Sequence, residues 1–386
     1  MNKNILFLSN NYQGGIAVFN ERLVECINNS TNNSAKVLYY NTYPQSFEGK
    51  RTVINKFANK TYSYQKLKSL FSEGIICCSE SIELEALNYF KYKGQIIYFL
   101  HGDYPYYYST AKKFESIIDG FACVSELIKE KLDTLLPHRK HNIQIIKAIL
   151  PIITEPNSDE PDNKNGLIFI GRAIEAKGFN YIPVIYDKLK EKGHNISLSI
   201  YCQEKNASTQ NLKQKHPEIT IEYGKKNDHI IKVLRQALYL IFPSKYEGLP
   251  IVVAEAMQQG VIPITSDLPI LKILTNNCGF NFKYNDVNSF VNTIIKLETD
   301  TSLQKRLSNN AKEKVKKLFN TQKTLQNFKI LTSIKKEKQF INYKMLCSRL
   351  DRPFIPNWLT IRIRITKTKT NKILNLLNYL RIKSYL

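Results

Sequence analysis

Two glutamates, Glu247 and Glu255, are separated by seven residues in the segment 242–260. The apolar run that ends at Phe242 predicts a strand, so Glu247 falls in the loop that follows it. Glu255 falls inside a predicted helix that ends near Gly260. The two carboxylates therefore do not lie on one helix, and we expect them to hold the two ends of an elongated polar ligand.

The turn before this predicted helix offers backbone donors to an anion. Gly248 gives the chain freedom to turn, and Pro250 suits the first helical position, where its missing N–H costs nothing. The backbone around Leu249, Pro250 and Ile251 then lies at a helix N-terminus, which is a natural phosphate site. A nucleotide sugar, with its diphosphate at this turn, fits the pattern.

Two cations follow another predicted strand, 167–170. Arg172 comes directly after Gly171, and Lys177 follows before the next predicted helix. Cations on the loop beyond a strand can neutralise a diphosphate leaving group. No Asp-x-Asp metal motif stands at a convincing strand end, so we expect no metal. Two exposed cations without a ligand are the alternative interpretation.

Two further candidates lie in the first half of the chain. His101 directly follows the predicted strand 95–100, where a histidine can hydrogen-bond a reacting sugar. A lone histidine is more often an ordinary loop residue. Gly14 and Gly15 lie between the first predicted strand and helix, without a Gly-x-Gly-x-x-Gly pattern, so no dinucleotide site is predicted. A tight turn that needs glycine is the alternative for this pair.

The motifs together resemble glycosyltransferase family four, also called glycosyl transferases group 1. Glu247 and Glu255, within Glu-Gly-Leu-Pro and Glu-Ala-Met, carry most of the resemblance, and the flanking segments 237–244 and 263–267 add to it. The resemblance is best over residues 166–318. In the first 150 residues it rests on the Gly-Gly loop, the histidine and the Phe-Ala-Cys-Val-Ser segment, and it does not extend to the last 50 residues.

This resemblance implies a retaining transfer without a metal. The motifs specify neither the base nor the sugar of the donor; we expect a hexose-type sugar from a UDP- or GDP-sugar. The resemblance would place Glu247 at the hydroxyls of the donor sugar, Glu255 at the ribose, and Arg172 and Lys177 at the departing diphosphate. The expected catalytic residues are His101 and Glu247. The expected donor-binding residues are Gly14, Gly15, Arg172, Lys177, Glu247, Gly248, Leu249, Pro250, Ile251 and Glu255.

Short apolar runs alternate with amphipathic stretches along the chain, which predicts parallel, doubly wound sheets. With the resemblance, we expect an α/β protein of the GT-B class, with two Rossmann-like domains that face a central cleft. The expected domains are residues 1–155 and 167–332, joined by a polar linker at 156–166 and followed by a basic extension at 333–386. The first domain would lie on the acceptor side.

Ten strands are expected. The predicted strand segments are 5–8, 36–40, 74–78, 95–100, 120–124, 167–170, 197–201, 220–223, 239–242 and 262–265. In the basic extension, apolar and basic residues alternate over 360–366, which suggests another strand, and the spacing of leucines over 371–382 predicts a helix.

The chain of 386 residues carries a formal net charge of +23, and 13 Lys/Arg against two Asp/Glu lie between residues 334 and 386. Such a field favours a polyanionic partner, although a solvated basic surface is the alternative. The seven cysteines show no metal-binding spacing, which predicts reduced thiols in a cytosolic protein. No run of about 18 uncharged apolar residues is present, so no membrane span is predicted.

The expected acceptor is a bacterial surface glycan, such as lipopolysaccharide core, capsule or another lipid-linked saccharide. The basic extension and the aromatic segment 104–108 motivate this hypothesis. The extension could hold a cytoplasmic enzyme on the inner face of the cytoplasmic membrane, or it could pack on the first domain. The alternatives are an epimerase or hydrolase of the same fold, a catalytically inactive lectin-like module, and a basic nucleic-acid-binding protein, although no recognised nucleic-acid motif is present.

Overall fold

The computed structural model describes residues 3–10, 14–40, 54–55, 57–151 and 164–383. Within the last helix, side chains are described as far as Asn371. The predicted linker, 156–166, lies outside the described residues as far as 163, and its last two residues, 165–166, belong to a strand.

The chain folds into two compact units. Residues 1–146 and 325–386 form the first unit, and residues 147–324 form the second. The chain thus returns to the first unit for its last 62 residues. This division differs from the expected one, which assigned residues 325–332 to the second domain and set 333–386 apart as an extension.

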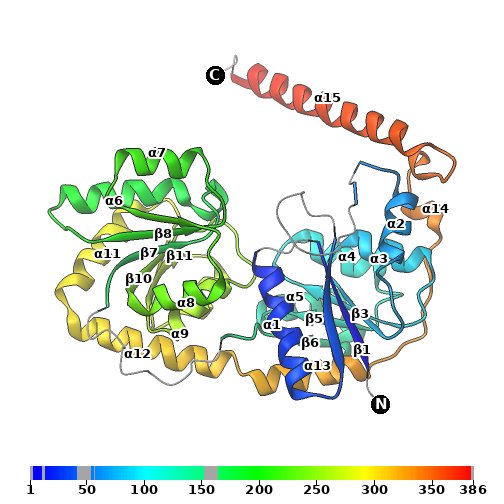
Figure 1. The fold of residues 1–386 in the computed structure, drawn as a ribbon, viewed down its shortest axis with the longest axis horizontal. Coiled ribbons are helices and arrows are strands. Elements are labelled where there is room, and N and C mark those ends of the chain that lie inside the picture. The colour runs from blue at the N-terminus through cyan, green and yellow to red at the C-terminus, as the bar shows by residue number, and fades with distance from the viewer. Residues whose placement is uncertain (1–2, 11–13, 41–53, 56, 152–163, 384–386) are drawn as a thin grey trace. The chain divides into compact units, whose positions relative to one another are not determined.

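The first unit contains a six-stranded sheet in the order β2-β1-β3-β4-β5-β6 (Figure 1). All the strand pairs of this sheet are parallel. The strands are almost uninterrupted apolar runs because both faces of the sheet are covered. They are β1 (Asn4–Ser9), β2 (Ser34–Tyr39), β3 (Ile75–Cys78), β4 (Gln95–Leu100), β5 (Gly120–Cys123) and β6 (Ile143–Ile145).

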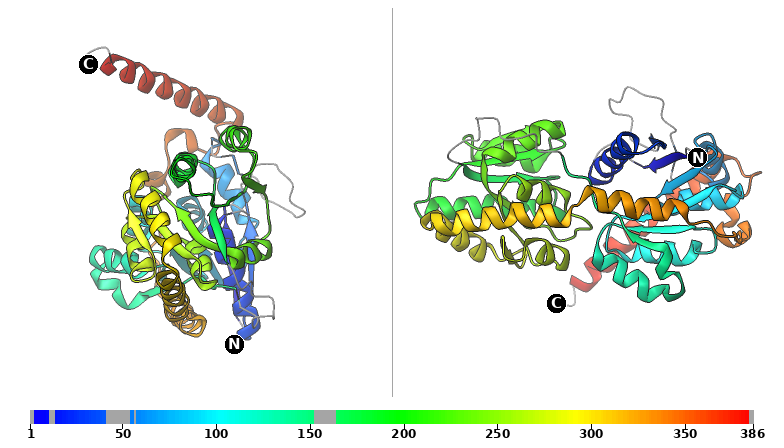
Figure 2. Two further views of the ribbon diagram at one scale, coloured as in Figure 1. Left: turned by 90° about the vertical axis from the view of Figure 1, so that its left-hand side faces the viewer. Right: turned by 90° about the horizontal axis from the view of Figure 1, so that it is seen from below.

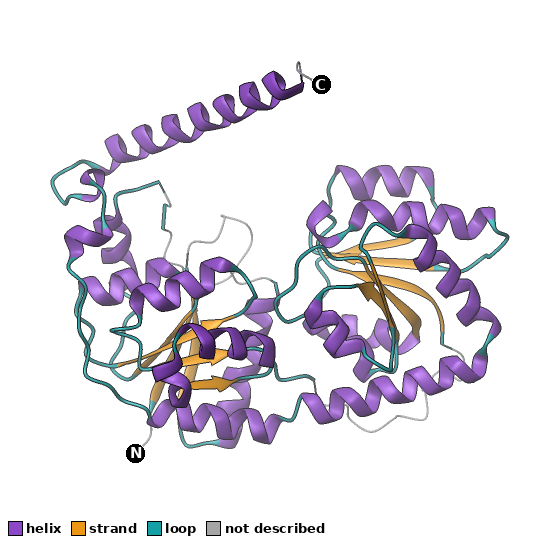
Figure 3. Ribbon diagram, turned by 180° about the vertical axis from the view of Figure 1, so that it is seen from behind, coloured by secondary structure: helices purple, strands orange, loops and turns teal. Residues whose placement is uncertain are grey.

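Helices connect these strands and lie on both sides of the sheet (Figure 3). Those of the N-terminal part are α1 (Gly15–Ser30), α2 (Lys60–Lys68), α3 (Ser81–Tyr89), α4 (Pro105–Phe114), α5 (Glu126–Leu135) and a 3-10 helix, Pro137–Asn142. The returning chain adds α13 (Thr321–Ser333), α14 (Tyr343–Leu346), a 3-10 helix at Arg349–Asp351, and α15 (Asn357–Lys383). The order of β1 to β5 is that of flavodoxin-like sheets, in which the strand order reverses at the first strand.

The second unit contains another six-stranded parallel sheet, in the order β12-β11-β10-β7-β8-β9. Counted from its own first strand, this is the Rossmann order 6-5-4-1-2-3, with the reversal between β7 and β10. The strands are β7 (Asn165–Ile170), β8 (Leu198–Cys202), β9 (Thr220–Tyr223), β10 (Ala237–Phe242), β11 (Ile262–Ser266) and β12 (Phe280–Phe282).

The helices of the second unit flank this sheet (Figure 2), and apolar residues of several of them join its buried core. They are α6 (Ile182–Glu191), α7 (Ala207–Lys215), α8 (Asn227–Gln236), α9 (Ile251–Gln258), α10 (Pro269–Thr275), α11 (Val287–Thr299) and α12 (Thr301–Leu318), with 3-10 turns at Glu175–Lys177 and Phe179–Tyr181. The core includes the fully buried Phe169, Ile241 and Phe290.

The two sheets confirm the expected α/β fold with two Rossmann-like domains. Each predicted strand in residues 1–270 is present within one or two residues. The strands β6 and β12 were not predicted, because a run of three residues gives no readable period. The central cleft stays a prediction.

The prediction of a strand over residues 360–366 is wrong, because these residues lie in α15. Thr360 is fully buried and Arg364, one helical turn later, donates from Nη1 to the carbonyl of Ala58 at 2.7 Å. Contacts four residues apart fit the period of a helix, and they outweigh the two-residue alternation of apolar and basic side chains that suggested a strand. The helix predicted over 371–382 is confirmed as part of α15. No helix in the described part of the chain is both long and apolar enough to cross a membrane.

Candidate functional site

The reversal of strand order in the second sheet places two loops side by side. The strands β7 and β10 are parallel neighbours, with Leu240 opposite Ile168, so both end at the same edge. The loop after β7 carries Arg172 and Lys177, and the loop after β10 carries Glu247. Ligands of doubly wound sheets bind at this point, beyond the carboxyl ends of the strands.

The loop after β7 needs glycine at Gly178 for two reasons. Its φ of 69° lies in the left-handed region, and a Cβ there would lie 2.0 Å from the carbonyl oxygen of Pro243. The close approach holds the loop against the start of the loop after β10. The backbone N–H of Lys245 adds a hydrogen bond of 3.0 Å to the carbonyl of Ala176.

Buried hydroxyls hold the loop after β10 in place. Ser244 is fully buried, and its Oγ lies 3.3 Å from the carbonyl oxygen of Ala176 and 3.1 Å from that of Tyr246. The hydroxyl of Ser266, at the end of β11, donates to the carbonyl of Ser244 at 2.5 Å. These contacts position the backbone directly before Glu247.

Lys177 and Glu247 form an ion pair. The ammonium nitrogen of Lys177 lies 2.6 Å from Oε1 of Glu247, and the two side chains are 22% and 7% exposed. The same nitrogen lies 5.8 Å from the ring centroid of Phe242. The sequence marked both residues as candidates, but it assigned the lysine to the diphosphate and the glutamate to the sugar, without a contact between them.

Arg172 stands apart from this pair as an exposed cation on the same loop. No ion pair involves its guanidinium within the described residues. The ammonium of the neighbouring Lys245 is paired with Oε1 of Glu175 at 2.5 Å and lies 4.9 Å from the ring of Tyr284. Arg172 is therefore the cation of these loops that is available to a phosphate. The ion pair between Lys245 and Glu175, which also joins the two loops, was not predicted from the sequence.

The helix α9 begins one residue later than expected, because Pro250 is its N-cap and not its first helical residue. With φ −78° and ψ 76°, Pro250 forms an inverse γ-turn in which the N–H of Ile251 donates to the carbonyl of Leu249 at 2.9 Å. The expectation that this N–H is free for phosphate is therefore wrong. Gly248 lies directly before this turn and is partly buried.

Glu255 lies on α9 and is 4% exposed. The helix is buried over most of its length and ends at Gln258, and Gly260, just after its C-cap, has a left-handed φ of 74°. A carboxylate that is buried on a helix is costly to desolvate, and such groups are usually paired or functional. Glu247 and Glu255 thus differ as expected, one in a loop and one on a helix.

The remaining candidates lie in the first unit. Gly14 is the N-cap of α1 with a φ of 97°, a conformation that favours glycine, and Gly15 is the first helical residue. A Cβ on either glycine would meet no atom within 4 Å, so both are open toward solvent or a ligand. The residues before them, 11–13, lie outside the described part of the chain.

His101 directly follows β4, at the edge of the first sheet where the carboxyl ends of its parallel strands lie. Its ring packs edge-on against Phe19 of α1 at 5.0 Å and stacks with Phe99 at 5.6 Å. Burial lowers the pKa of His101 to about 3, so the imidazole is neutral at pH 7. Its Nε2 is buried and has no hydrogen-bond partner among the described residues, which is unusual for a buried polar atom.

The structure thus groups the candidates in two sets. Arg172, Lys177, Glu247 and Glu255 belong to the second unit, where Lys177 and Glu247 touch. Gly14, Gly15 and His101 belong to the first unit, where Phe19 links the glycine turn to the histidine. Among the residues that the structure describes, no group of three or more His, Cys, Asp or Glu side chains could hold a metal ion.

Comparison with known proteins finds a family match over the part of the chain that carries these loops. Residues 153–314 match the model of the family "Glycosyl transferases group 1", a range that includes both loops and α9. The chain is 31% identical over 115 residues to the UDP-Gal:alpha-D-GlcNAc-diphosphoundecaprenol alpha-1,3-galactosyltransferase of Escherichia coli, which covers 28% of each protein. It is 27% identical over 227 residues to an uncharacterized glycosyltransferase of Methanocaldococcus jannaschii, covering 56% of this chain and 59% of the relative. The chain therefore matches 28% to 59% of the length of these curated relatives.

A solved structure extends the likeness of fold to most of the chain. The structure of Anabaena HepE in complex with UDP and glucose superposes with a TM-score of 0.67 and 14% identity, over 86% of this chain and all of that chain. This likeness supports the two-domain GT-B architecture. Residues 153–314 are therefore similar to the glycosyl transferases group 1 family, as the sequence motifs suggested.

Proposed function

We propose that the protein is a retaining glycosyltransferase that moves a hexose-type sugar from a UDP- or GDP-sugar to a glycan acceptor. One observation carries this proposal: the Lys177–Glu247 ion pair and the exposed Arg172 share the reversal point of the second Rossmann sheet. A free guanidinium and a paired carboxylate at this point suit a ligand with a diphosphate beside a hydroxylated sugar.

In the proposed mechanism, the departing diphosphate is stabilised by Arg172 and by the protons of Lys177 that do not face Glu247. The ion pair fixes the carboxylate of Glu247, which accepts hydrogen bonds from sugar hydroxyls. Glu255 accepts from the ribose. We assign no covalent nucleophile. The reaction is proposed to need no metal, because the two cations supply the positive charge.

His101 is proposed to orient the sugar through Nε2. Since the imidazole is neutral at pH 7, it serves as a hydrogen-bond partner and not as a charged acid. Nε2 is covered in this structure, so the contact requires its neighbours to move when the sugar binds. Gly14 and Gly15 are proposed to let a phosphate or acceptor approach the start of α1.

The names of two similar proteins support a uridine nucleotide as the first donor to test. The Escherichia coli relative takes UDP-Gal, and the Anabaena structure contains UDP. The acceptor of the former is a saccharide on diphosphoundecaprenol. We therefore propose a lipid-linked precursor of a surface glycan, such as lipopolysaccharide or capsule, as the acceptor, and the cytoplasmic face of the membrane as the site of action.

The proposal is tested by incubating the protein with UDP-sugars, with and without lipid-linked saccharides. Transfer that is lost in Arg172→Ala and in Glu255→Ala supports it. Turnover of the donor at the same rate without any acceptor would instead indicate an epimerase or hydrolase of this fold. Salt-sensitive binding of RNA or DNA with no binding of any nucleotide sugar would contradict it.

A further inference from the structure

The returning segment of the first unit exposes large apolar side chains close together in the sequence. Met345 on α14 is 80% exposed, Phe354 between the 3-10 helix and α15 is 73% exposed, and Trp358 in the first turn of α15 is 61% exposed. Trp358 is also the single tryptophan of the chain. Scattered exposed apolar residues are ordinary, but three this large within 14 residues indicate a surface that another body covers.

These side chains project from a backbone that is fixed to the first unit. Asp351, which is 1% exposed, accepts from the backbone N–H of Lys60 at 3.0 Å and of Ser348 at 2.8 Å, and it pairs with Arg364. The backbone carbonyl of Asp351 accepts from the hydroxyl of Thr61 at 2.8 Å. The turns that carry the three apolar residues are therefore packed around one buried carboxylate and are not a loose tail.

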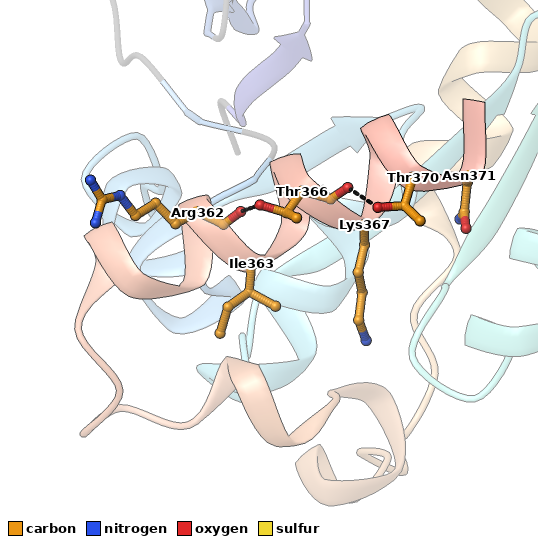
Figure 4. A pocket seen from close by; sticks show the side chains of 6 residues that line it. All are labelled: Arg362, Ile363, Thr366, Lys367, Thr370 and Asn371. Atoms are coloured by element: carbon orange, nitrogen blue, oxygen red, sulfur yellow. Dashed lines mark hydrogen bonds between the residues drawn. The ribbon is translucent and has the colours of Figure 1, made fainter. Parts of the chain in front are cut away.

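Exposed cations flank the apolar residues along the chain. Lys344, Arg349 and Arg352 are exposed, and the guanidinium carbon of Arg352 lies 5.8 Å from the ring centroid of Phe354. Farther along α15, Arg362 and Lys367 extend from the helix (Figure 4). Between 344 and 371, Asp351 is the single acidic residue, and it is already used by the network.

We propose that residues 344–371 form a docking surface for an anionic lipid bilayer. Met345, Phe354 and Trp358 would enter the headgroup region, and the flanking cations would contact lipid phosphates. This mixture of aromatic, aliphatic and basic side chains is typical of elements that lie on a membrane without crossing it. The inference rests on the proposed function in one respect, because a lipid-linked acceptor would be presented at such a surface.

Charge and apolar exposure together favour a bilayer over a nucleic acid or a second copy of the chain. A nucleic acid could pair with the cations, but Met345, the most exposed of the three apolar residues, gains nothing from a phosphate backbone. A second copy would bring the same positive charge against itself. A bilayer with anionic headgroups uses both features at once.

The experiment uses the fluorescence of Trp358 in the full chain. Phosphatidylcholine vesicles with and without phosphatidylglycerol are added, and acyl chains brominated near the headgroup serve as quenchers. We expect a blue shift and quenching with the anionic vesicles alone. Unchanged emission, or an equal change with purely zwitterionic vesicles, would overturn the proposal. The proposal would also fail if self-association or added RNA shifts the emission of Trp358 and anionic vesicles do not.

Two variants keep the fluorophore and remove one feature each. Met345→Ser with Phe354→Ser removes apolar surface, and Arg352→Gln with Arg362→Gln removes charge; each should weaken vesicle binding about tenfold or more. The matched control is Val184→Ser with Ile273→Ser, which changes exposed apolar residues of the second unit and should bind vesicles like the wild type. Equal weakening in the control would contradict the assignment. UDP-sugar binding in solution, measured in parallel, reports separately on the proposed function.

Discussion

The ammonium of Lys177 lies 2.6 Å from Oε1 of Glu247, 70 residues away in the sequence, and the two residues lie on the loops that follow the neighbouring strands β7 and β10. The pair joins the end of the loop after β7 to the loop after β10. Each residue therefore limits the rotamers of the other, so that a change in one is expected to disturb the site through both.

Lys177→Met should lower transfer by about a hundredfold or more, because it removes a cation from the diphosphate and leaves the carboxylate of Glu247 unconstrained. It should also lower the free energy of unfolding by about 1–3 kcal/mol, since Glu247 is nearly buried and loses its partner. Steady-state kinetics with a UDP-sugar and urea unfolding check the two effects.

The control is Lys245→Met, which breaks the neighbouring pair with Glu175. That glutamate is 74% exposed, so the free energy of unfolding should fall much less than in Lys177→Met. If the two variants lose the same stability, the Lys177–Glu247 pair has no special burial, and its role as a fixed element of the site is wrong.

Gly178→Ala should destabilise the protein more than Gly193→Ala. Both glycines have left-handed φ angles, 69° and 81°, so both substitutions strain the backbone. A Cβ added at Gly178 would lie 2.0 Å from the carbonyl oxygen of Pro243, whereas a Cβ added at Gly193 would meet no atom within 4 Å. Urea unfolding should show a further loss of about 1–3 kcal/mol for Gly178→Ala. Equal losses would mean that the two loops are not in close contact.

The neutral state of His101 predicts a pH dependence of stability. Its pKa is about 3 in the fold and about 6.5 in the unfolded chain. As the pH falls below 6.5, the unfolded state takes up the proton first, so the free energy of unfolding should fall by about 2 kcal/mol between pH 6.5 and pH 5. His101→Phe lacks this proton uptake. Urea unfolding of both proteins at pH 7 and pH 5 should show a smaller loss in the variant; an identical loss would show that the imidazole is not buried as described.

The sequence predicted most of the fold because parallel strands in covered sheets are continuous apolar runs. Every strand of four residues or more was found, including β7 and β10, whose ends carry the site. The alternation over 360–366 gave a wrong prediction, because a two-residue period indicates a strand only where the edge of a sheet can pair with that segment. There the buried Thr360 and the bond from Arg364 to Ala58 select a helix, and these are tertiary contacts that no local pattern contains.

The candidate site was predicted as a set of residues and not as a geometry. Motifs identified Arg172, Lys177, Glu247 and Glu255. The contact between Lys177 and Glu247, however, follows from the order of the strands in the sheet, which cannot be read from the sequence. The turn at Pro250 was placed within one residue, yet its use of the Ile251 N–H depends on backbone angles. The return of the chain to the first unit was one of two alternatives that the sequence left open.

The most direct test of the central claim is binding of nucleotide sugars to the purified full chain. Saturation-transfer NMR with UDP-, GDP-, ADP- and CMP-sugars compares the wild type with Arg172→Ala and Glu255→Ala. We predict that one donor class, first of all a UDP-sugar, binds selectively and that both variants lose it. A folded wild-type protein that binds none of these donors would contradict the proposed donor site in the second unit.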